Sequence, residues 1–297
     1  MRLSLSQRRA VSAYVLLVVP LLFFVFIRIV PTLSALQVAF YQWDMLSEER
    51  PFVGLANFQR LAADTVFSKA LLNTLEYVLL GVPTGLVLAL GIALALNRVR
   101  RFAGLFRTVY FIPFVTSLVA VSWVWRWLLQ PQRGSINEVI GLLGIPPQPF
   151  LQSTSQALPS IVAVNVWHDL GFQVVIFLAG LQAVPETYYE AARLDGAGRW
   201  ALFRSITLPL LNPTLVFLAV TSTISSLQVF TQVQNMSAQG TGGPLNSTLS
   251  LVLYVYQKAF GGAYQMGYAA AMTVVLFGLI LLVTLIQLRL LSRRYEL

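Results

Sequence analysis

Long apolar stretches separated by short polar segments dominate the pattern of the chain. A membrane-spanning helix needs about 20 consecutive, mostly apolar residues. Six stretches meet this requirement, and they lie at about residues 11–33, 71–96, 109–129, 158–181, 211–233 and 268–290. The pattern therefore predicts an all-α integral membrane protein whose membrane domain, residues 11–291, contains six transmembrane helices.

The first apolar stretch also resembles a secretory signal peptide, because Arg8 and Arg9 precede it. The apolar core of a signal peptide is only about 7–15 residues long. The stretch at 11–33 is longer and has no convincing A-x-A cleavage site. We therefore expect a retained helix, preceded by a short N-terminal segment at residues 1–10.

The composition agrees with a membrane protein. Of 297 residues, 57% are hydrophobic and 10% are charged, whereas a soluble domain carries about 25% charged residues. This composition disfavours a water-soluble enzyme and a disordered chain. The formal net charge of +9 would suggest nucleic-acid binding in a soluble protein. Membrane proteins instead collect Arg and Lys in cytoplasmic loops, so we expect no nucleic-acid partner.

The distribution of basic residues predicts the orientation of the chain. Thirteen fall on the side that holds both termini, and five fall on the opposite side. The thirteen are Arg2, Arg8, Arg9, Arg98, Arg100, Arg101, Arg107, Arg193, Arg199, Arg204, Arg289, Arg293 and Arg294; the five are Arg50, Arg60, Lys69, Arg133 and Lys258. Cytoplasmic loops carry the excess of positive charge. We therefore expect both termini in the cytoplasm, with residues 292–297 as a cytoplasmic tail.

Several kinds of catalytic and metal chemistry are excluded by residue counts. The only lysines, Lys69 and Lys258, follow no G-x-x-x-x-G-K-[ST] loop, so a P-loop for ATP is missing. His168 is the only histidine and there is no cysteine, which excludes multi-histidine and thiolate metal sites. We expect no catalytic residues, cofactor or metal in this chain.

The segment between the fourth and fifth apolar stretches, residues 183–209, carries the most specific pattern. Pro185 suits the first turn of a helix, and Glu186 and Glu190 suit its positively charged N-terminal end. Gly196 can end that helix in a left-handed conformation. We predict two short helices joined by a glycine turn, which is also compatible with an amphipathic helix lying on the membrane surface.

Within this segment, Glu190-Ala191-Ala192 is followed at fixed spacing by Gly196 and Leu208-Pro209, and the intervening Asp195-Gly-Ala is also characteristic. This spacing resembles the EAA loop of bacterial ABC importer permeases, specifically the carbohydrate-uptake family. Val53-Gly-Leu-Ala-Asn-Phe58, Asn73-Thr74, Gly134-Ser-Ile-Asn137, Gly242-Gly-Pro244, Thr248 and Met266-Gly-Tyr-Ala-Ala270 extend the resemblance along nearly the whole chain.

The resemblance implies a type I ABC importer permease core in a bacterial or archaeal cytoplasmic membrane. The implied partners are a second permease subunit, two P-loop ATPase subunits that bind ATP and Mg, and an extracytoplasmic solute-binding protein. The solute is expected to be a sugar or oligosaccharide. The EAA helix, with Glu190, Ala191, Ala192, Asp195 and Gly196, is expected to couple the permease to the ATPase.

Polar residues inside the apolar stretches are candidates for the solute pathway, because such groups are costly in lipid and tend to face a cavity or a partner. The candidates are Glu76, Asn165, His168, Asp169, Ser222, Ser225, Ser226, Gln228, Phe230 and Gln232. Hydroxyl and amide groups beside an aromatic ring suit sugar recognition. Helix packing through small polar residues is the competing interpretation.

Three other functions remain possible at this stage. A phosphate-bearing polyol such as glycerol 3-phosphate would call for convergent Arg or Lys residues in the pathway, and the fourth to sixth stretches contain almost none in their interiors. An ion-coupled secondary transporter would use Glu76 or Asp169 as a proton site and would work without an ATPase. A sensor or scaffold would form a complex without moving solute.

Overall fold

The computed structural model describes residues 4–99, 103–262 and 264–291, and these residues form helices and loops with only isolated β-bridges. The chain divides into two compact units. One contains residues 1–63 and 255–275, and the other contains residues 64–254 and 276–297. The predictions for Arg2, Arg100, Arg101, Arg293, Arg294, the side chain of Arg8 and the tail 292–297 lie outside the described residues.

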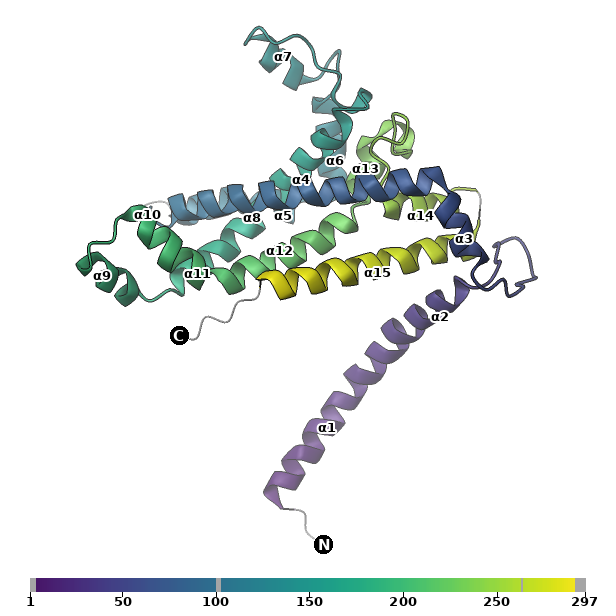
Figure 1. Cartoon of the computed structure of the whole chain (residues 1–297), viewed down its shortest axis with the longest axis horizontal. Helices are drawn as coiled ribbons and strands as arrows, with labels where there is room; N and C mark the ends of the chain where they lie inside the picture. Colours follow the sequence, from purple (N-terminus) through teal and green to yellow (C-terminus); the bar gives the residue numbers. More distant parts are fainter. Residues whose placement is uncertain (1–3, 100–102, 263, 292–297) are drawn as a thin grey trace. The chain divides into compact units, whose positions relative to one another are not determined.

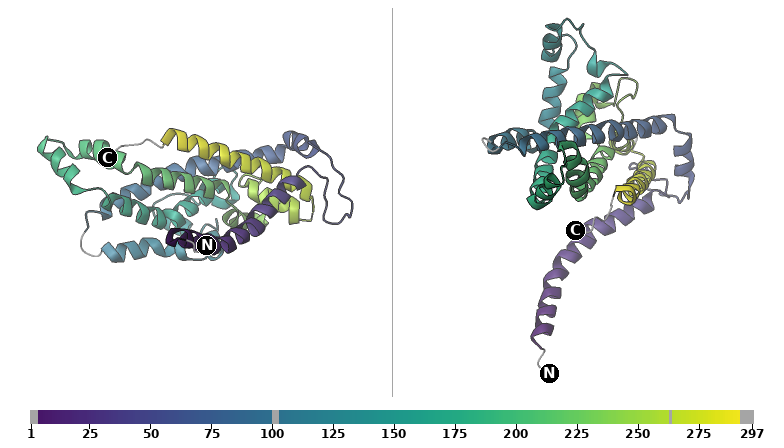
Figure 2. Two further views of the ribbon diagram at one scale, coloured as in Figure 1. Left: turned by 90° about the horizontal axis from the view of Figure 1, so that it is seen from below. Right: turned by 60° about the vertical axis from the view of Figure 1, so that its left-hand side comes forward.

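The first unit begins with a single long apolar rod. It consists of α1 (Leu5–Phe24), a π-helical segment (Val25–Ile29) and α2 (Val30–Val38), which follow one another without a loop (Figures 1 and 2). Its large apolar side chains, such as Phe23, are exposed in this chain. A helix that is apolar all round is stable in lipid rather than in water, which agrees with the predicted first span.

The rest of the first unit is a loop region stabilised by hydrogen bonds. After the rod, the Asn57 amide in α3 (Ala56–Ala63) donates to the carbonyl oxygens of Ala39 and Tyr41 at 2.9 and 3.0 Å. Arg60 stacks on the ring of Tyr268 at 4.2 Å. The Asn57 hydrogen bonds and the Arg60–Tyr268 contact stabilise the loop that follows α2.

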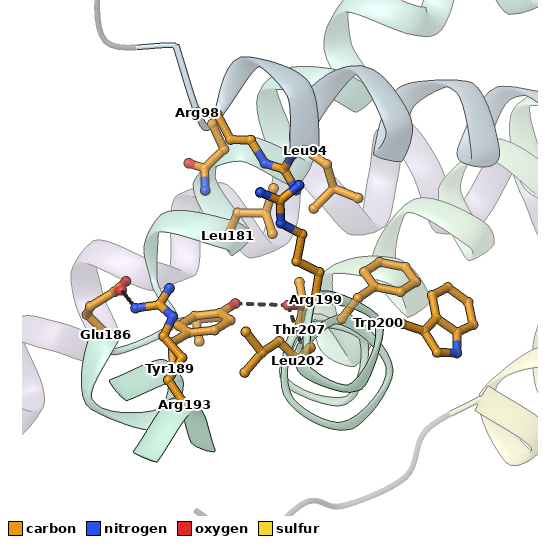
Figure 3. A pocket seen from close by; sticks show the side chains of 13 residues that line it. Leu94, Arg98, Leu181, Glu186, Tyr189, Arg193, Arg199, Trp200, Leu202 and Thr207 are labelled. Atoms are coloured by element: carbon orange, nitrogen blue, oxygen red, sulfur yellow. Dashed lines mark hydrogen bonds and ion pairs between the residues drawn. The ribbon is translucent and has the colours of Figure 1, made fainter. Parts of the chain in front are cut away.

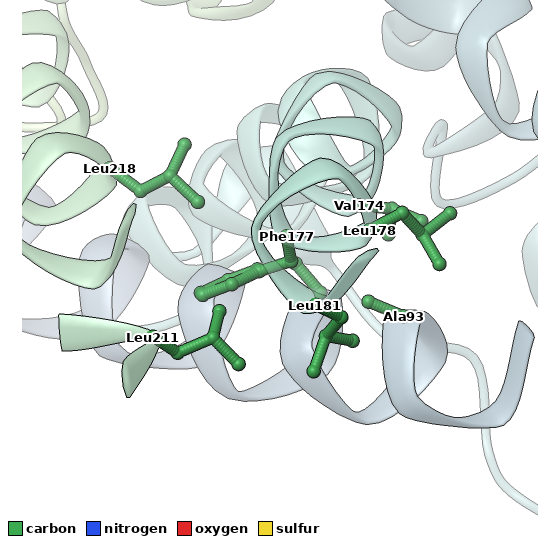
Figure 4. Close-up of a cluster of buried hydrophobic side chains, with 8 residues drawn as sticks. Ala93, Val174, Phe177, Leu178, Leu181, Leu211 and Leu218 are labelled. Carbon is green, nitrogen blue, oxygen red and sulfur yellow. The ribbon is translucent and has the colours of Figure 1, made fainter. Parts of the chain in front are cut away.

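The second unit is built on two long helices, α4 (Thr65–Leu96) and α8 (Ala157–Gln182). The Asp64 carboxylate caps α4 by accepting bonds from the first backbone N–H groups at 2.8 and 3.1 Å. Figure 4 shows the core cluster that α8 forms with α4 and α12 (Asn212–Leu227). The cluster consists of Ala89, Ala93, Val174, Phe177, Leu178, Leu181, Leu211 and Leu218. The two alanines let the helices approach closely around the larger side chains.

The predicted third span is divided in the structure. The helix α5 (Ala103–Val115) is followed by α6 (Leu118–Leu128), and the two are bent by 93° at a short break. The backbone of α5 lies directly against Gly171 of α8, where a methyl group would collide with the Tyr110 carbonyl. Hydropathy alone indicated one continuous span here, whereas in the structure α5 packs mainly against α8 and α6 mainly against α13.

The predicted fifth span is also divided. A run from Arg199 to Leu210, formed by α10 (Arg199–Leu202), a π-helical segment and α11 (Leu208–Leu210), meets α12 at a bend of 64°. The helix then stops at Leu227 and restarts as α13 (Thr231–Met236). Pro209 lies inside this run, in the first turn of α11. The bend falls at Leu211, just before Asn212-Pro213.

Within the described residues, four helices are long and apolar enough to cross a membrane, and the count rises to six if each bent pair is one span. The four contain residues 12–38, 65–96, 157–182 and 266–291. The last of the four is α15 (Met266–Leu291). The other elements are α7 (Ser135–Gly141), α9 (Glu186–Leu194), α14 (Leu251–Phe260) and 3₁₀ turns at Phe150–Gln152 and Ala238–Gly240. The helical, multi-span class predicted from the sequence is confirmed.

Candidate coupling loop and transport pathway

The loop between α8 and α11 forms two short helices, as the sequence predicts. The first, α9, begins after Pro185, and α10 begins after Gly198. Between them, Gly196 has a φ of +81°. The N–H of Ala197 bonds to the Ala192 carbonyl and that of Gly196 to the Arg193 carbonyl. This pair of hydrogen bonds forms a Schellman cap, in which glycine is favoured at the position with a left-handed backbone conformation.

Every residue of α9 is at least partly exposed, and so are Asp195 and Gly196 in the turn after it. All five residues that the EAA resemblance singles out are therefore accessible. Leu194 is 89% exposed, which is unusual for a leucine on an ordered helix in water. It lies one turn beyond Glu190 and Ala191 and next to Asp195. The helix therefore presents carboxylates, a small residue and one free apolar side chain together, a combination suited to docking against another protein.

A second group of candidate residues lies on one face of α8. The His168 ring and the Asp169 carboxylate form a close pair, with 2.7 Å between Nδ1 and Oδ1. The side chain of His168 is 9% exposed and that of Asp169 is 37% exposed. In the neutral tautomer that donates from Nδ1–H to this carboxylate, Nε2 is a hydrogen-bond acceptor.

Three buried acceptor atoms occur on α8. In the part of the chain that the structure describes, Asn165 Oδ1, His168 Nε2 and Gln173 Oε1 are buried and have no hydrogen-bond partner. The Gln173 amide also donates to Ser222 Oγ in α12 at 3.1 Å. Buried polar atoms normally have partners, and each exception calls for an explanation. Unpaired acceptors suit a ligand that brings hydroxyl donors.

The candidates after residue 222 lie around the break between α12 and α13. Ser222, Ser226, Phe230 and Gln232 are half-buried, whereas Ser225 and Gln228 are exposed. Gln228 and Phe230 belong to the non-helical segment itself, and α8 packs against both flanking helices. Transporters often place solute sites where a spanning helix is discontinuous. The candidate residues around the break, from Ser222 to Gln232, therefore lie on elements that pack against α8.

Glu76 lies apart from the other candidates. It is exposed on α4, although Asn73, one turn earlier, is 1% exposed. Asn73 donates to the carbonyl oxygens of Asn246 and Leu249 at 2.7 and 3.0 Å. The two residues therefore differ in their environments, although they lie one turn apart on α4. The structure gives Asn73 a structural contact and leaves Glu76 available to another surface.

Two features of these regions were not singled out from the sequence. Gln173 is not among the candidates predicted from the sequence, and its bond to Ser222 depends on the packing of α8 against α12. The exposure of Leu194 also could not be predicted from the number of apolar residues in the segment. A helical projection of α8 could have identified Gln173 from the sequence. At 100° per residue, it lies on the same broad face as Asn165 and His168.

The structure combines several candidate membrane spans with a polar face on a buried helix and a discontinuous helix beside it. This combination is typical of membrane transport proteins. A model of the family "Binding-protein-dependent transport system inner membrane component" matches residues 81–296. The chain belongs to this family, which confirms the resemblance found in the EAA loop and identifies a multi-pass membrane protein.

Characterised relatives cover most of the chain. The lactose transport system permease protein LacF of Rhizobium radiobacter is 37% identical over 239 residues, covering 80% of each chain. The trehalose/maltose permease protein MalF of Thermococcus litoralis is 32% identical over 286 residues, covering 96% of this chain and 95% of the relative. The diacetylchitobiose permease protein NgcF of Streptomyces coelicolor is 34% identical over 270 residues, covering 87% and 76%. All three are transport permeases, as the sequence predicted, rather than enzymes.

Solved structures agree. A chain of a bacterial alginate ABC transporter, in complex with its alginate pentasaccharide-bound periplasmic protein, superimposes with a TM-score of 0.82 at 25% identity. The match covers 95% of this chain and 94% of that chain. A second structure of a bacterial ABC transporter that imports alginate gives a TM-score of 0.80. The fold is that of an ABC importer permease.

Proposed function

We propose that this chain is one membrane-spanning subunit of an ATP-driven importer that takes up a sugar or oligosaccharide delivered by a binding protein. The observation that carries this proposal is the set of unpaired acceptors on α8, at Asn165, His168 and Gln173. Sugars carry many hydroxyl donors. The substrates in the names of the three relatives, which are lactose, trehalose or maltose, and diacetylchitobiose, support the same class.

A phosphate-bearing polyol fits this region less well. Recognition of phosphate calls for Arg or Lys side chains. The described helices α8, α12 and α13 contain neither residue type. The carboxylate of Asp169 beside the unpaired acceptors would repel an anion. A neutral, hydroxyl-rich solute is the better match.

We further propose that this subunit forms half of the pathway together with a second permease. Exposed carboxylates are costly in lipid and tend to face a cavity or a partner. Glu76 and Asp169 are exposed in the isolated chain, so we place them toward the pathway or the second subunit. Six spans at about the predicted positions, with both termini in the cytoplasm, complete this proposal.

The exposed face of α9 is the proposed contact with an ATPase subunit. Two such subunits, which bind ATP and Mg, would change the pathway from inward-facing to outward-facing when they close. Glu190 and Asp195 supply charges for a basic partner surface, and Ala191, Ala192 and Leu194 allow close approach. The rigid Gly196 turn fixes the direction in which α9 emerges.

Coupling is tested by a pair of glycine variants in the reconstituted complex. Gly196→Val places a β-branched residue at a φ of +81°, which is strongly disfavoured. Gly198→Val is the matched control, because Gly198 has a φ of −74° and open space around its Cα. We expect Gly196→Val to lose most of the ATPase stimulation by solute-loaded binding protein and the control to keep it. Full stimulation in both variants would refute the coupling role of this turn.

The importer class itself is tested by purification from the native membrane in mild detergent. We expect mass spectrometry to identify a second permease and a P-loop ATPase with the chain. A chain that purifies alone and moves solute under an ion gradient would instead be a secondary transporter, and one that forms the complex without solute flux would be a sensor.

A further inference from the structure

A cavity of about 700 Å³ lies in the second unit, where the ends of α4 and α8 meet α9 and α10. Figure 3 shows the side chains that line it. Its volume is in the range of sites that hold small molecules. The cavity is separate from the polar face of α8 described above, because its lining contains none of those residues. Its chemistry therefore needs its own explanation.

The cavity has an excess of positive charge. Three arginines and one glutamate line it, and Arg193 is paired with Glu186 at 3.0 Å. Arg98 and Arg199 have no carboxylate within ion-pair distance among the described residues. Figure 3 shows Arg199 extending from α10 toward the end of α4 that carries Arg98. Two unpaired guanidinium groups on one cavity repel each other unless an anion lies between them.

The uncharged part of the lining is mixed: it contains the polar Asn97, Tyr189 and Thr207, and an apolar portion that reaches the hydrophobic core. Leu181 belongs to the core cluster and Leu94 packs against it. Trp200, on the opposite wall, is 69% exposed. A ligand for this cavity therefore needs an anionic group and an apolar part. An inorganic anion would use only the first feature.

The position of the cavity also indicates which kind of ligand could bind there. It lies just beyond the last turns of α4 and α8, two of the helices long enough to cross a membrane. Lipid headgroups lie at that level of a spanning helix. Trp side chains concentrate there too, and basic pockets between spanning helices bind anionic headgroups.

We propose that this cavity binds an anionic phospholipid, with its phosphate between Arg98 and Arg199 and an acyl chain along Leu94 and Leu181. The site is compatible with a docked α9. Glu186, Tyr189 and Arg193 face the cavity, and the 100° helical spacing puts Ala191 and Asp195 on the opposite side. A lipid here would join the spans to the coupling loop and so stabilise their relative orientation.

The test uses the purified full chain in detergent, with lipid binding measured by native mass spectrometry. Phosphatidylglycerol and phosphatidylcholine, with the same acyl chains, are titrated separately. The double variant Arg98→Gln with Arg199→Gln removes both free charges. Arg9→Gln with Arg204→Gln is the matched control, since both arginines are exposed and lie outside the cavity. Arg98→Lys with Arg199→Lys keeps the charges.

We expect the wild type and the control to retain phosphatidylglycerol in preference to phosphatidylcholine. The glutamine variant should bind phosphatidylglycerol about 30-fold more weakly, since each basic residue near a membrane surface contributes about a factor of five. The lysine variant should recover most of this loss. Equal binding by the glutamine variant and the control overturns the proposal. Displacement of the lipid by millimolar inorganic phosphate also overturns it, because the ligand would then be a free phosphate.

Discussion

The hydrogen bonds from α4 to the segment before α14 allow a quantitative prediction for Asn73→Ala. Asn73 is 1% exposed and donates to two main-chain carbonyl oxygens, those of Asn246 and Leu249, at 2.7 and 3.0 Å. The variant leaves both oxygens without this donor. A buried polar group that loses its partner costs about 1–3 kcal/mol. We therefore expect the free energy of unfolding to fall by roughly 2–5 kcal/mol.

Neighbouring bonds do not replace these two. The Tyr77 hydroxyl donates to the Thr248 carbonyl at 3.1 Å, and the Leu251 N–H donates to Thr74 Oγ1 at 2.9 Å. Both bind other atoms of the same segment. The remaining contacts hold the segment near α4, so the variant should fold but unfold at a lower temperature.

The assay is thermal unfolding of the purified chain in detergent. A loss of this size corresponds to a fall in Tm of roughly 5–15 °C. Asn73→Asp keeps the size of the side chain but removes its N–H donors, so it should be destabilised as much as Asn73→Ala. Glu76→Gln, at an exposed position one turn away, is the control. A fall in Tm no larger than that of the control, in either Asn73 variant, would refute this account of the two bonds.

Three further changes test the packing and the pathway. Gly171→Ala should lower the free energy of unfolding by about 1–3 kcal/mol, because its methyl group would collide with the backbone of α5; Gly91→Ala, in open space, should show no such loss in thermal unfolding. Asp64→Ala should cost about 1 kcal/mol by removing the cap of α4, and Asp64→Asn should recover most of it in the same measurement. Gln173→Leu removes the bond to Ser222 and an unpaired acceptor, so it should raise the apparent KM for solute about tenfold in proteoliposomes; an unchanged KM would exclude Gln173 from the pathway.

The sequence alone was sufficient for the membrane class, the family and the Gly196 turn. Each depends on local information. An apolar stretch of sufficient length is stable as a helix in lipid whatever lies beside it. The helices at Thr65–Leu96 and Ala157–Gln182 accordingly contain the second and fourth apolar stretches, at 71–96 and 158–181. The left-handed φ of Gly196 follows from the residues immediately around it.

The tertiary structure alone decided where the spans break and which polar residues meet. Hydropathy sums the transfer free energies of the side chains, and this sum is the same for a bent helix as for a straight one. A count of apolar residues therefore does not reveal the bend after Val115 or the break after Leu227. The pairing of Gln173 with Ser222, 49 positions apart, depends on helix packing that no local pattern contains. The same packing brings Arg98 and Arg199 to one cavity, although the sequence shows them only as two positive charges in separate loops.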